Sequence, residues 1–200
     1  SSVEKIEIYN TSNVTDMYHA FEGCQVLKYI TPLDTSNVTD MTAAFYQCSS
    51  LSELPINNTS KVTSFSVAFY RTAIKNVPNI DTSNATNVFG IFSQCPNLQY
   101  VPKLNFGNVK NANGAFESNH NLTDLDGFTD LGKNPDLNCN SMFAYSENIT
   151  RQSCINIFNN LYDRADAGYT IKDLSFAPEV IARLNDEDIA IATNKGWIIS

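Results

Sequence analysis

The sequence predicts an α/β repeat protein. Short coils are expected to stack so that their parallel strands form one face and their helical segments another, and an α-rich region is expected to follow. A recurring phenylalanine is the first reason: it stands at 21, 45, 69, 92, 116 and 143, with gaps of 24, 24, 23, 24 and 27 residues. The second is that TSNVTDM occurs at both 11–17 and 35–41. A fixed period over many copies is typical of proteins whose units stack on one another.

The first half of each unit predicts a helix. Val38, Met41, Phe45 and Cys48 are spaced three, four and three residues apart, which places them on one stripe of an α-helix. Asn37 precedes this stripe, with Asp40 three residues later, as in a helix start whose side chains cap the first turn. This spacing predicts the helical face.

The second half predicts a short strand. LSELPINNT, residues 51–59, matches the L-x-x-L-x-L-x-x-N frame of a leucine-rich repeat. Prolines follow the strand positions and end the pairing, because proline has no N–H to donate; they are Pro32, Pro55, Pro78 and Pro102. We therefore expect a right-handed leucine-rich-repeat solenoid of about six coils over residues 1–149, with one parallel β-sheet face. Because the chain starts mid-repeat, we expect further repeats or a cap upstream.

Residues 150–200 lose the period and predict a C-terminal capping region. Thr150 stands before an amphipathic helical stretch, TIKDLSF at 170–176 suits a further strand, and Pro178 suits the first turn of a short helix. Asn185 precedes a second acidic-start helix that Gly196 ends. A stack of coils needs such an end because its last coil otherwise exposes apolar columns and an open strand edge.

Composition excludes several classes of function. The 200 residues are 42% hydrophobic and carry a net charge of −8, which disfavours binding to nucleic acid or to anionic lipid. No apolar stretch approaches the roughly 20 residues of a membrane helix, so we expect no membrane insertion by this segment. The first residues lack the charged and apolar regions of a signal peptide.

The repeat resembles a known family. TSNVTDM, the following phenylalanine and cysteine, and the spaced leucines are similar to the BspA-like leucine-rich repeats of bacterial surface proteins, over residues 3–149. The third copy departs from this pattern at Lys61, Phe65 and Thr72. The resemblance implies an extracellular protein on the bacterial cell surface, with its signal and anchor outside this segment. It also implies adhesion to a protein or glycan of a host or a neighbouring cell, and it brings no catalytic residues.

The exposed face of the strands is the candidate binding site. Side chains alternate along a strand, so the residues before the second apolar column point away from the core. They are Tyr29, Glu53, Asn76, Tyr100 and Asp124. Tyrosines spaced among acids and amides suit contacts with a protein or a glycan. A solvated face without a ligand is the alternative. Tyr46 and Tyr70 form a second aromatic row, for which packing between coils is one interpretation.

The five cysteines favour neither a metal site nor a catalytic one. Cys24, Cys48 and Cys95 share one repeat column, for which buried thiols are expected, whereas Cys139 and Cys154 leave open a disulfide where the repeats end. The chain has no C-x-x-C and only two histidines, His19 and His120, which we expect at the surface.

Two other motifs have simple interpretations. DLDGFTD, residues 124–130, suggests calcium, but its glycine is fourth rather than sixth as an EF-hand requires. The Asn-x-Ser/Thr sequons at 13, 37, 84 and 121 follow from the repeat itself, where asparagine and threonine cap turns.

We therefore expect a monomeric, non-enzymatic binding or adhesion module without cofactors or metals. A structural spacer or phage-tail-like display component with no ligand of its own is the alternative. An enzyme is the third hypothesis, and no catalytic motif in the sequence favours it.

Overall fold

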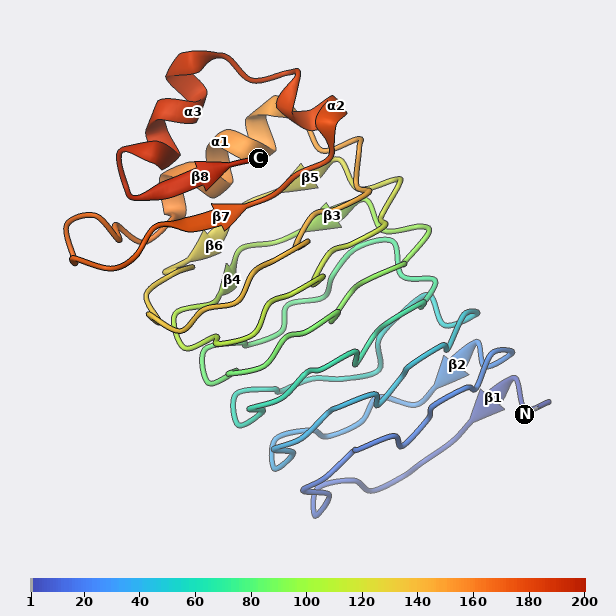
Figure 1. The fold of residues 1–200 in the computed structure, drawn as a ribbon. Helices are drawn as coiled ribbons and strands as arrows, with labels where there is room; N and C mark the ends of the chain where they lie inside the picture. Colours follow the sequence, from blue (N-terminus) through green and yellow to red (C-terminus); the bar gives the residue numbers. More distant parts are fainter. Residues whose placement is uncertain (1) are drawn as a thin grey trace.

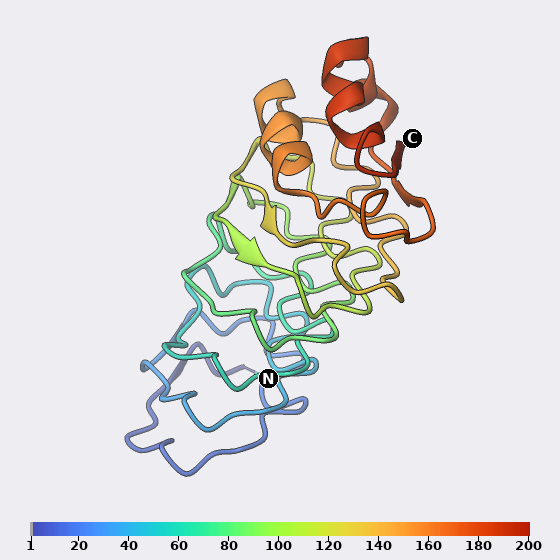
Figure 2. The ribbon, with the colours of Figure 1, turned by 90° about the vertical axis from the view of Figure 1, so that its left-hand side faces the viewer.

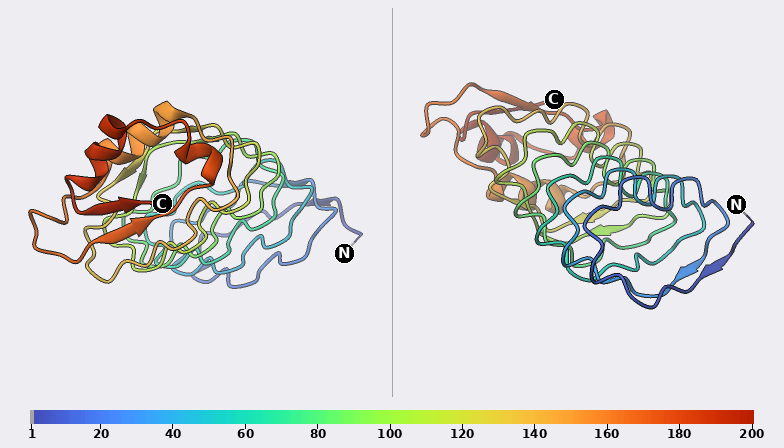
Figure 3. Two further views of the ribbon diagram at one scale, coloured as in Figure 1. Left: turned by 45° about the horizontal axis from the view of Figure 1, so that its top comes forward. Right: turned by 90° about the horizontal axis from the view of Figure 1, so that it is seen from below.

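The computed structural model describes residues 2–200 and is a stack of coils closed by helices. Figure 1 shows the coils following one another from the N-terminus to the helices at the C-terminal end, and Figure 3 shows them nested along the stack. A ladder of parallel bridges joins one residue from each coil: Asp16, Asp40, Ser64, Asn87, Asn111 and Asn138. The ladder therefore confirms a stack with the period of the sequence repeat.

The strands are very short and pair in parallel across neighbouring coils. β1 (Lys5–Ile6) pairs with β2 (Tyr29–Ile30), β3 (Tyr100–Val101) pairs with β5 (Asp124–Leu125), and β4 (Leu104–Asn105) pairs with β6 (Phe128–Thr129). The prediction of one parallel β-sheet face is confirmed only in part, because the strands form separate two-stranded sheets with isolated bridges between some of the other coils. The prolines that follow the strands supply the physical reason, because proline has no N–H to donate to the neighbouring strand.

The predicted helical face is also wrong, although its buried stripe is confirmed. Met41–Ala44 and Phe45–Cys48 form two consecutive turns, each closed by a hydrogen bond from the fourth N–H to the first carbonyl, of 3.0 and 3.1 Å. The third residues of these turns, Ala43 and Gln47, have φ of 54° and 59°, which is the backbone of a type II turn. Consecutive four-residue turns bury every fourth residue, as one face of a helix does.

Hydrogen bonding between coils explains why turns replace the helix. The N–H of Phe45 donates to the carbonyl of Ala68 in the next coil over 2.8 Å, and the N–H of Ala43 donates to Ser66 over 2.9 Å. A helix would direct these donors along its own axis instead. Glycines in the sequence could have indicated these turns, because Gly23, Gly90 and Gly114 occupy turn positions and all have positive φ.

Polar side chains complete the hydrogen bonding between coils. Thr35 Oγ1 donates to the carbonyl of Asn58 over 2.6 Å, and Asn84 Nδ2 donates to the carbonyl of Ser60 over 2.7 Å. Within a coil, Asp40 accepts the N–H of Thr42 over 2.7 Å, so it stabilises a turn and not a helix start. These residues recur because each coil leaves the same backbone groups to be satisfied.

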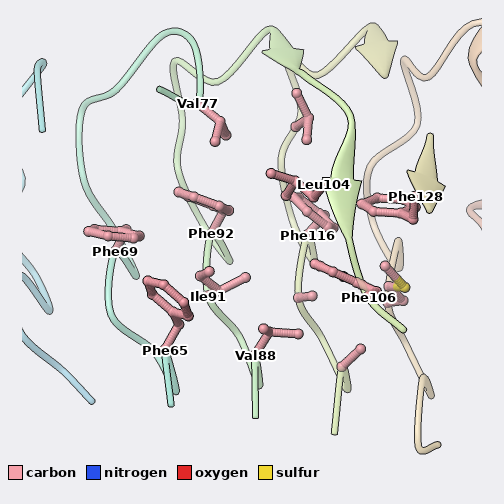
Figure 4. Packing of buried hydrophobic residues seen from close by; sticks show 14 of the residues in the cluster. Phe65, Phe69, Val77, Val88, Ile91, Phe92, Leu104, Phe106, Phe116 and Phe128 are labelled. Carbon is pink, nitrogen blue, oxygen red and sulfur yellow. The ribbon is translucent and has the colours of Figure 1, made fainter. Parts of the chain in front are cut away.

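A column of stacked phenylalanine rings fills the core. Phe45, Phe69, Phe92 and Phe116 have neighbouring ring centroids 5.2–5.9 Å apart and no exposed surface. Figure 4 shows Phe69, Phe92 and Phe116 in successive coils, with Phe106 and Phe128 packed beside them. No single coil encloses such a ring, so the core exists only because the coils stack.

The predicted helices of the C-terminal region are confirmed. α1 (Arg151–Asn160) begins at Thr150, whose side chain accepts the N–H of Ser153, and α2 (Pro178–Ile181) begins at its proline. α3 (Asp186–Thr193) begins at Asn185 with a complete capping box. The strand predicted within residues 170–176 is confirmed as β7 (Lys172–Leu174), and it pairs in parallel with β8 (Trp197–Ile199), a strand that the sequence pattern did not predict. Figure 2 shows α1 and α3 beside each other at the end of the stack.

The C-terminal region continues the core of the coils before closing it. Phe176 bridges to Phe143, and their rings stack with centroids 4.8 Å apart, so one further phenylalanine extends the column. Arg164 is fully buried, and its guanidinium donates to the carbonyls of Gly132 and Thr170 over 2.6 and 3.0 Å. Burial lowers the pKa of Arg164, and the carbonyl acceptors satisfy its N–H groups.

Candidate functional site

The five predicted site residues lie along one face of the stack. Asn76 pairs with Tyr100, which in turn pairs with Asp124, so these three side chains follow one another across three coils. Tyr29 is 47% exposed, Glu53, Asn76 and Asp124 are exposed, and Tyr100 is half-buried. We call this set, Tyr29, Glu53, Asn76, Tyr100 and Asp124, the strand face. Its binding role stays a prediction.

One end of the strand face already has partners within the chain. The hydroxyl of Tyr100 donates to Asp126 over 2.5 Å, and this hydrogen bond raises the pKa of Tyr100. The hydroxyl of Thr123 donates to Asp124 over 2.7 Å. These contacts leave less free hydrogen-bonding capacity at Tyr100 and Asp124 than at the other end of the face.

Charged residues surround Tyr29. The ammonium of Lys5 lies 5.5 Å from the centroid of its ring, and the same ammonium pairs with Glu7 over 2.6 Å. The hydrogen bond between Lys5 and Glu7 raises the pKa of the amine and lowers that of the carboxyl. Lys28 pairs with Glu4 over 3.0 Å. Both signs of charge are therefore available beside this ring.

A groove of about 240 Å³ lies beside Tyr29 and Glu53. Its other lining residues are Lys28, Ile30, Pro32, Ser52, Leu54, Pro55 and Ile56. The structure thus brings two of the predicted residues together at one concave site. Sequence reasoning had not identified Ser52 or the two prolines as part of it, although the proline column was visible.

The remaining candidates are distributed singly over the surface. His19 lies beside Glu22, and His120 pairs with Glu147 over 2.9 Å; both histidines are partly exposed. In the stretch considered for calcium, Asp126 accepts from Tyr100 and Asp130 pairs with Lys133. Within residues 2–200, no three His, Cys, Asp or Glu side chains are arranged to hold a metal ion.

The sequon asparagines contact neighbouring coils. Asn37 Nδ2 donates to the carbonyl of Ser12 over 2.8 Å, and Asn121 Nδ2 donates to that of Pro96 over 2.6 Å. Lys61 also donates to the side-chain oxygen of Asn37 over 2.7 Å. The interpretation of these sequons as part of the repeat is therefore confirmed for Asn37, Asn84 and Asn121. Tyr46 and Tyr70 stack with centroids 4.8 Å apart, so this second row does pack between coils.

All five cysteines are free thiols. Four of them, Cys48, Cys95, Cys139 and Cys154, are buried, and Cys24 is partly exposed. Burial raises the pKa of Cys48 and Cys154 to about 12 and that of Cys95 and Cys139 to about 11. Cys139 and Cys154 do not form a disulfide in the structure, where Cys139 Sγ donates to the carbonyl of Asp173 over 3.2 Å.

The stacked coils and their exposed strand face are the architecture of a repeat protein. The chain belongs to the family described as Mycoplasma protein of unknown function, DUF285, whose profile matches residues 1–128 and, overlapping it, residues 71–159. The two matches together span every coil and continue into α1 (Arg151–Asn160). Family membership therefore covers the stack and leaves its function open.

A leucine-rich repeat protein from Bacteroides ovatus is a similar solved structure. The two share 18% identity at a TM-score of 0.33, over 74% of this chain and 54% of the other. The chain thus spans about half the length of that protein. No curated protein matches the chain. None of the helices within residues 2–200 has both the length and the hydropathy needed to cross a bilayer.

Proposed function

We propose that this protein is a non-enzymatic binding or adhesion module that recognises a protein or glycan through its strand face. One observation carries the proposal: the side chains of Asn76, Tyr100 and Asp124 follow one another in register, and a groove opens at Tyr29 and Glu53 on the same face. Side chains held at a regular spacing on a stacked scaffold suit an extended ligand. The coils themselves we assign to the BspA-like leucine-rich repeats, because their apolar frame and their TSNVTDM segment resemble that family.

The expected setting is extracellular, on a bacterial cell surface, with the protein acting as a monomer. This location rests on the resemblance to bacterial surface repeats. The partner is then a molecule of a host or of a neighbouring cell. The net charge of −8 supports a partner other than nucleic acid, because phosphate backbones require a basic surface.

Arrays of matrix proteins and glycans test this function. We expect at least one ligand to bind at micromolar concentration, and we expect the Tyr29→Ala plus Tyr100→Ala variant to weaken it at least tenfold, since aromatic residues dominate contact energies. Tyr18→Ala plus Tyr145→Ala is the matched control, because both of these tyrosines are exposed and neither belongs to the strand face. Equal loss in the two variants would remove the strand face from the binding site.

A spacer or phage-tail-like display component is the second candidate. The observation that favours it is the hydrogen bond from Tyr100 to Asp126, which leaves less free hydrogen-bonding capacity at that end of the face. Under this hypothesis the arrays give no binding at any concentration that keeps the protein monomeric.

A further inference from the structure

The first coil lies at the end of the stack opposite the helices, and its outer face is uncovered (Figure 1). At each interface between neighbouring coils, four alternate N–H groups of one coil donate to four alternate carbonyls of the next over 2.7–3.1 Å. The carbonyl of Ala44, for example, accepts the N–H of Phe21 over 2.8 Å, and Ala44 has no exposed surface. The equivalent carbonyls of the first coil accept no hydrogen bond from any group within residues 2–200; they belong to Asp16, Tyr18, Ala20 and Glu22.

The apolar side chains of this outer face are uncovered as well. Ala20 is exposed and Phe21 is half-buried, whereas Phe45, one coil further on, has no exposed surface. Phe21, Ile8 and Val14 line a hollow of about 240 Å³. The ring of Phe21 stacks on that of Phe45 with centroids 5.2 Å apart and meets no ring on its other side within residues 2–200. The phenylalanine column therefore begins at an open position.

The unpaired backbone groups of residues 16–22 are all acceptors. The N–H groups of residues 17–22 donate within the turns or to the second coil, as when Ala20 donates to the carbonyl of Met17 over 3.1 Å. The edge of an ordinary strand alternates N–H and C=O groups, so an added strand would place its own carbonyls against these carbonyls. Backbone folded into the same consecutive turns presents only N–H groups on the facing side, as it does at every interface within the stack.

A second copy of the chain does not supply these donors. Two first coils brought together would place acceptors against acceptors. The other end of the stack is closed, because Phe143 of the last coil bridges to Phe176 and the helices α1 and α3 lie over that end. The N–H groups of the last coil are therefore not available to the first coil of another copy.

We propose that the outer face of the first coil is an interface for the turn half of one further coil of the same repeat. We define the turn half as the part equivalent to residues 10–25. The strand half of that coil is already in place, because β1 pairs in register with β2. The docked turn half donates four N–H groups to the free carbonyls of residues 16–22 and places its own phenylalanine on Phe21. This interface continues the series of identical interfaces that holds the stack together.

An extended chain tests the inference. A copy of residues 34–48 is joined directly before Ser1, which places Val3 three residues after the copied Cys48, where Leu51 stands in the second unit. We expect the extended chain to melt at least about 4 °C above the chain of 200 residues. We also expect the amide protons of the copied Met41 and Phe45 to exchange at least about tenfold more slowly than in an unfolded peptide.

The matched control is the same extension with Met41→Ser and Phe45→Ser in the copied segment. It keeps the length and the turn residues and removes the apolar contacts, so its melting temperature should stay within about 1 °C of that of the unextended chain. Phe21→Ser, placed in both the extended and the unextended chain, should abolish the difference between them. Tyr145→Ser, at an exposed residue near the other end of the stack, should preserve it.

Two results would overturn the inference. One is an extended chain that melts with its control and exchanges its copied amide protons freely, since the added segment is then not docked. The other is a dimer of the unextended chain in sedimentation at micromolar concentration that the extension abolishes, which would assign the face to a second copy. We expect the unextended chain to sediment as a monomer.

Discussion

The coils and the C-terminal region solve the same problem of hydrogen bonding in different ways. In the coils, backbone donors and acceptors are satisfied by the neighbouring coil, as when Phe45 donates to Ala68. In the C-terminal region, α1 and α3 satisfy their own backbones and are held by particular side chains, such as Arg151 bound to Asp188 through two hydrogen bonds of 2.7 Å. Stability in the stack is therefore shared among similar contacts, whereas in the C-terminal region it depends on individual ones.

The difference predicts where a single substitution acts. A change within the stack disturbs the units on both sides, because each coil is a partner for two others. A change in the C-terminal region removes one contact that has no equivalent elsewhere in the chain. The sole tryptophan, Trp197, lies in that region and is 1% exposed, so its fluorescence reports on it separately.

The largest effect is expected from Phe69→Ala in the middle of the phenylalanine column. Phe69 stacks between Phe45 and Phe92, with ring centroids 5.9 and 5.2 Å away. Removing this buried ring leaves a cavity and should lower the free energy of unfolding by about 3–5 kcal/mol in chemical denaturation. The neighbouring Tyr70→Ala is the control, at about 1 kcal/mol, since Tyr70 is only half-buried. Equal losses would show that the column is not what holds the coils together.

A smaller effect, confined to the C-terminal region, is expected from Gly132→Ala. Gly132 has φ of 94°, and a Cβ added there meets the Trp197 ring at 2.3 Å, so the indole must move. We expect a loss of about 1–3 kcal/mol and a shift of tryptophan emission towards that of a solvated ring. Gly168→Ala is the matched control, because Gly168 also has positive φ, 68°, with no atom within 4 Å of the added Cβ. An unshifted emission in Gly132→Ala contradicts the packing described here.

Acid should weaken the contact between α1 and α3. The hydrogen bonds from Arg151 hold the pKa of Asp188 below its usual value of about 3.9. The ionised carboxylate therefore stabilises the fold above that usual value, and this contribution is lost as the pH falls through the lower pKa of the folded protein. Thermal melts from pH 6 to pH 2.5 should show this loss in the wild type and not in Asp188→Asn. Asp136→Asn, at an exposed position, should follow the wild type.

The smallest expected effect is chemical and concerns the cysteines. A thiol reagent at pH 8 should modify at most the partly exposed Cys24 in the native protein, because burial raises the pKa of the other four thiols. After denaturation it should count five. A count below five would indicate a disulfide, and fast reaction of Cys48 or Cys154 would show that the coils or the C-terminal region open readily.

Much of the fold was readable from particular residues. The interval between phenylalanines predicted the stack, and Thr150, Pro178 and Asn185 predicted the starts of three helices. The helical face was wrong because Met41, Phe45 and Cys48 have a spacing that consecutive turns share with a helix. Only the direction of the backbone N–H groups distinguishes a helix from consecutive turns, and that direction depends on the neighbouring coil.

The candidate site was predictable in outline. Alternation along a strand placed Tyr29 and Glu53 on the outside, and the structure brings them to one groove. The contribution of the prolines to this groove was not predicted, although Pro55 was known to end the pairing. Recognising it required the stacking of neighbouring coils, because Pro32 and Pro55 belong to different repeat units and line one groove only in the stack.

The sequence by itself determined the period, the composition of the buried columns and the positions of the helix caps. These depend on local spacing and on which side chains avoid water. The tertiary structure decided whether the buried stripe is helix or turn, which strands pair, and which carbonyls stay free. Those outcomes depend on hydrogen bonds between residues about 24 positions apart, and such bonds exist only once the coils have stacked.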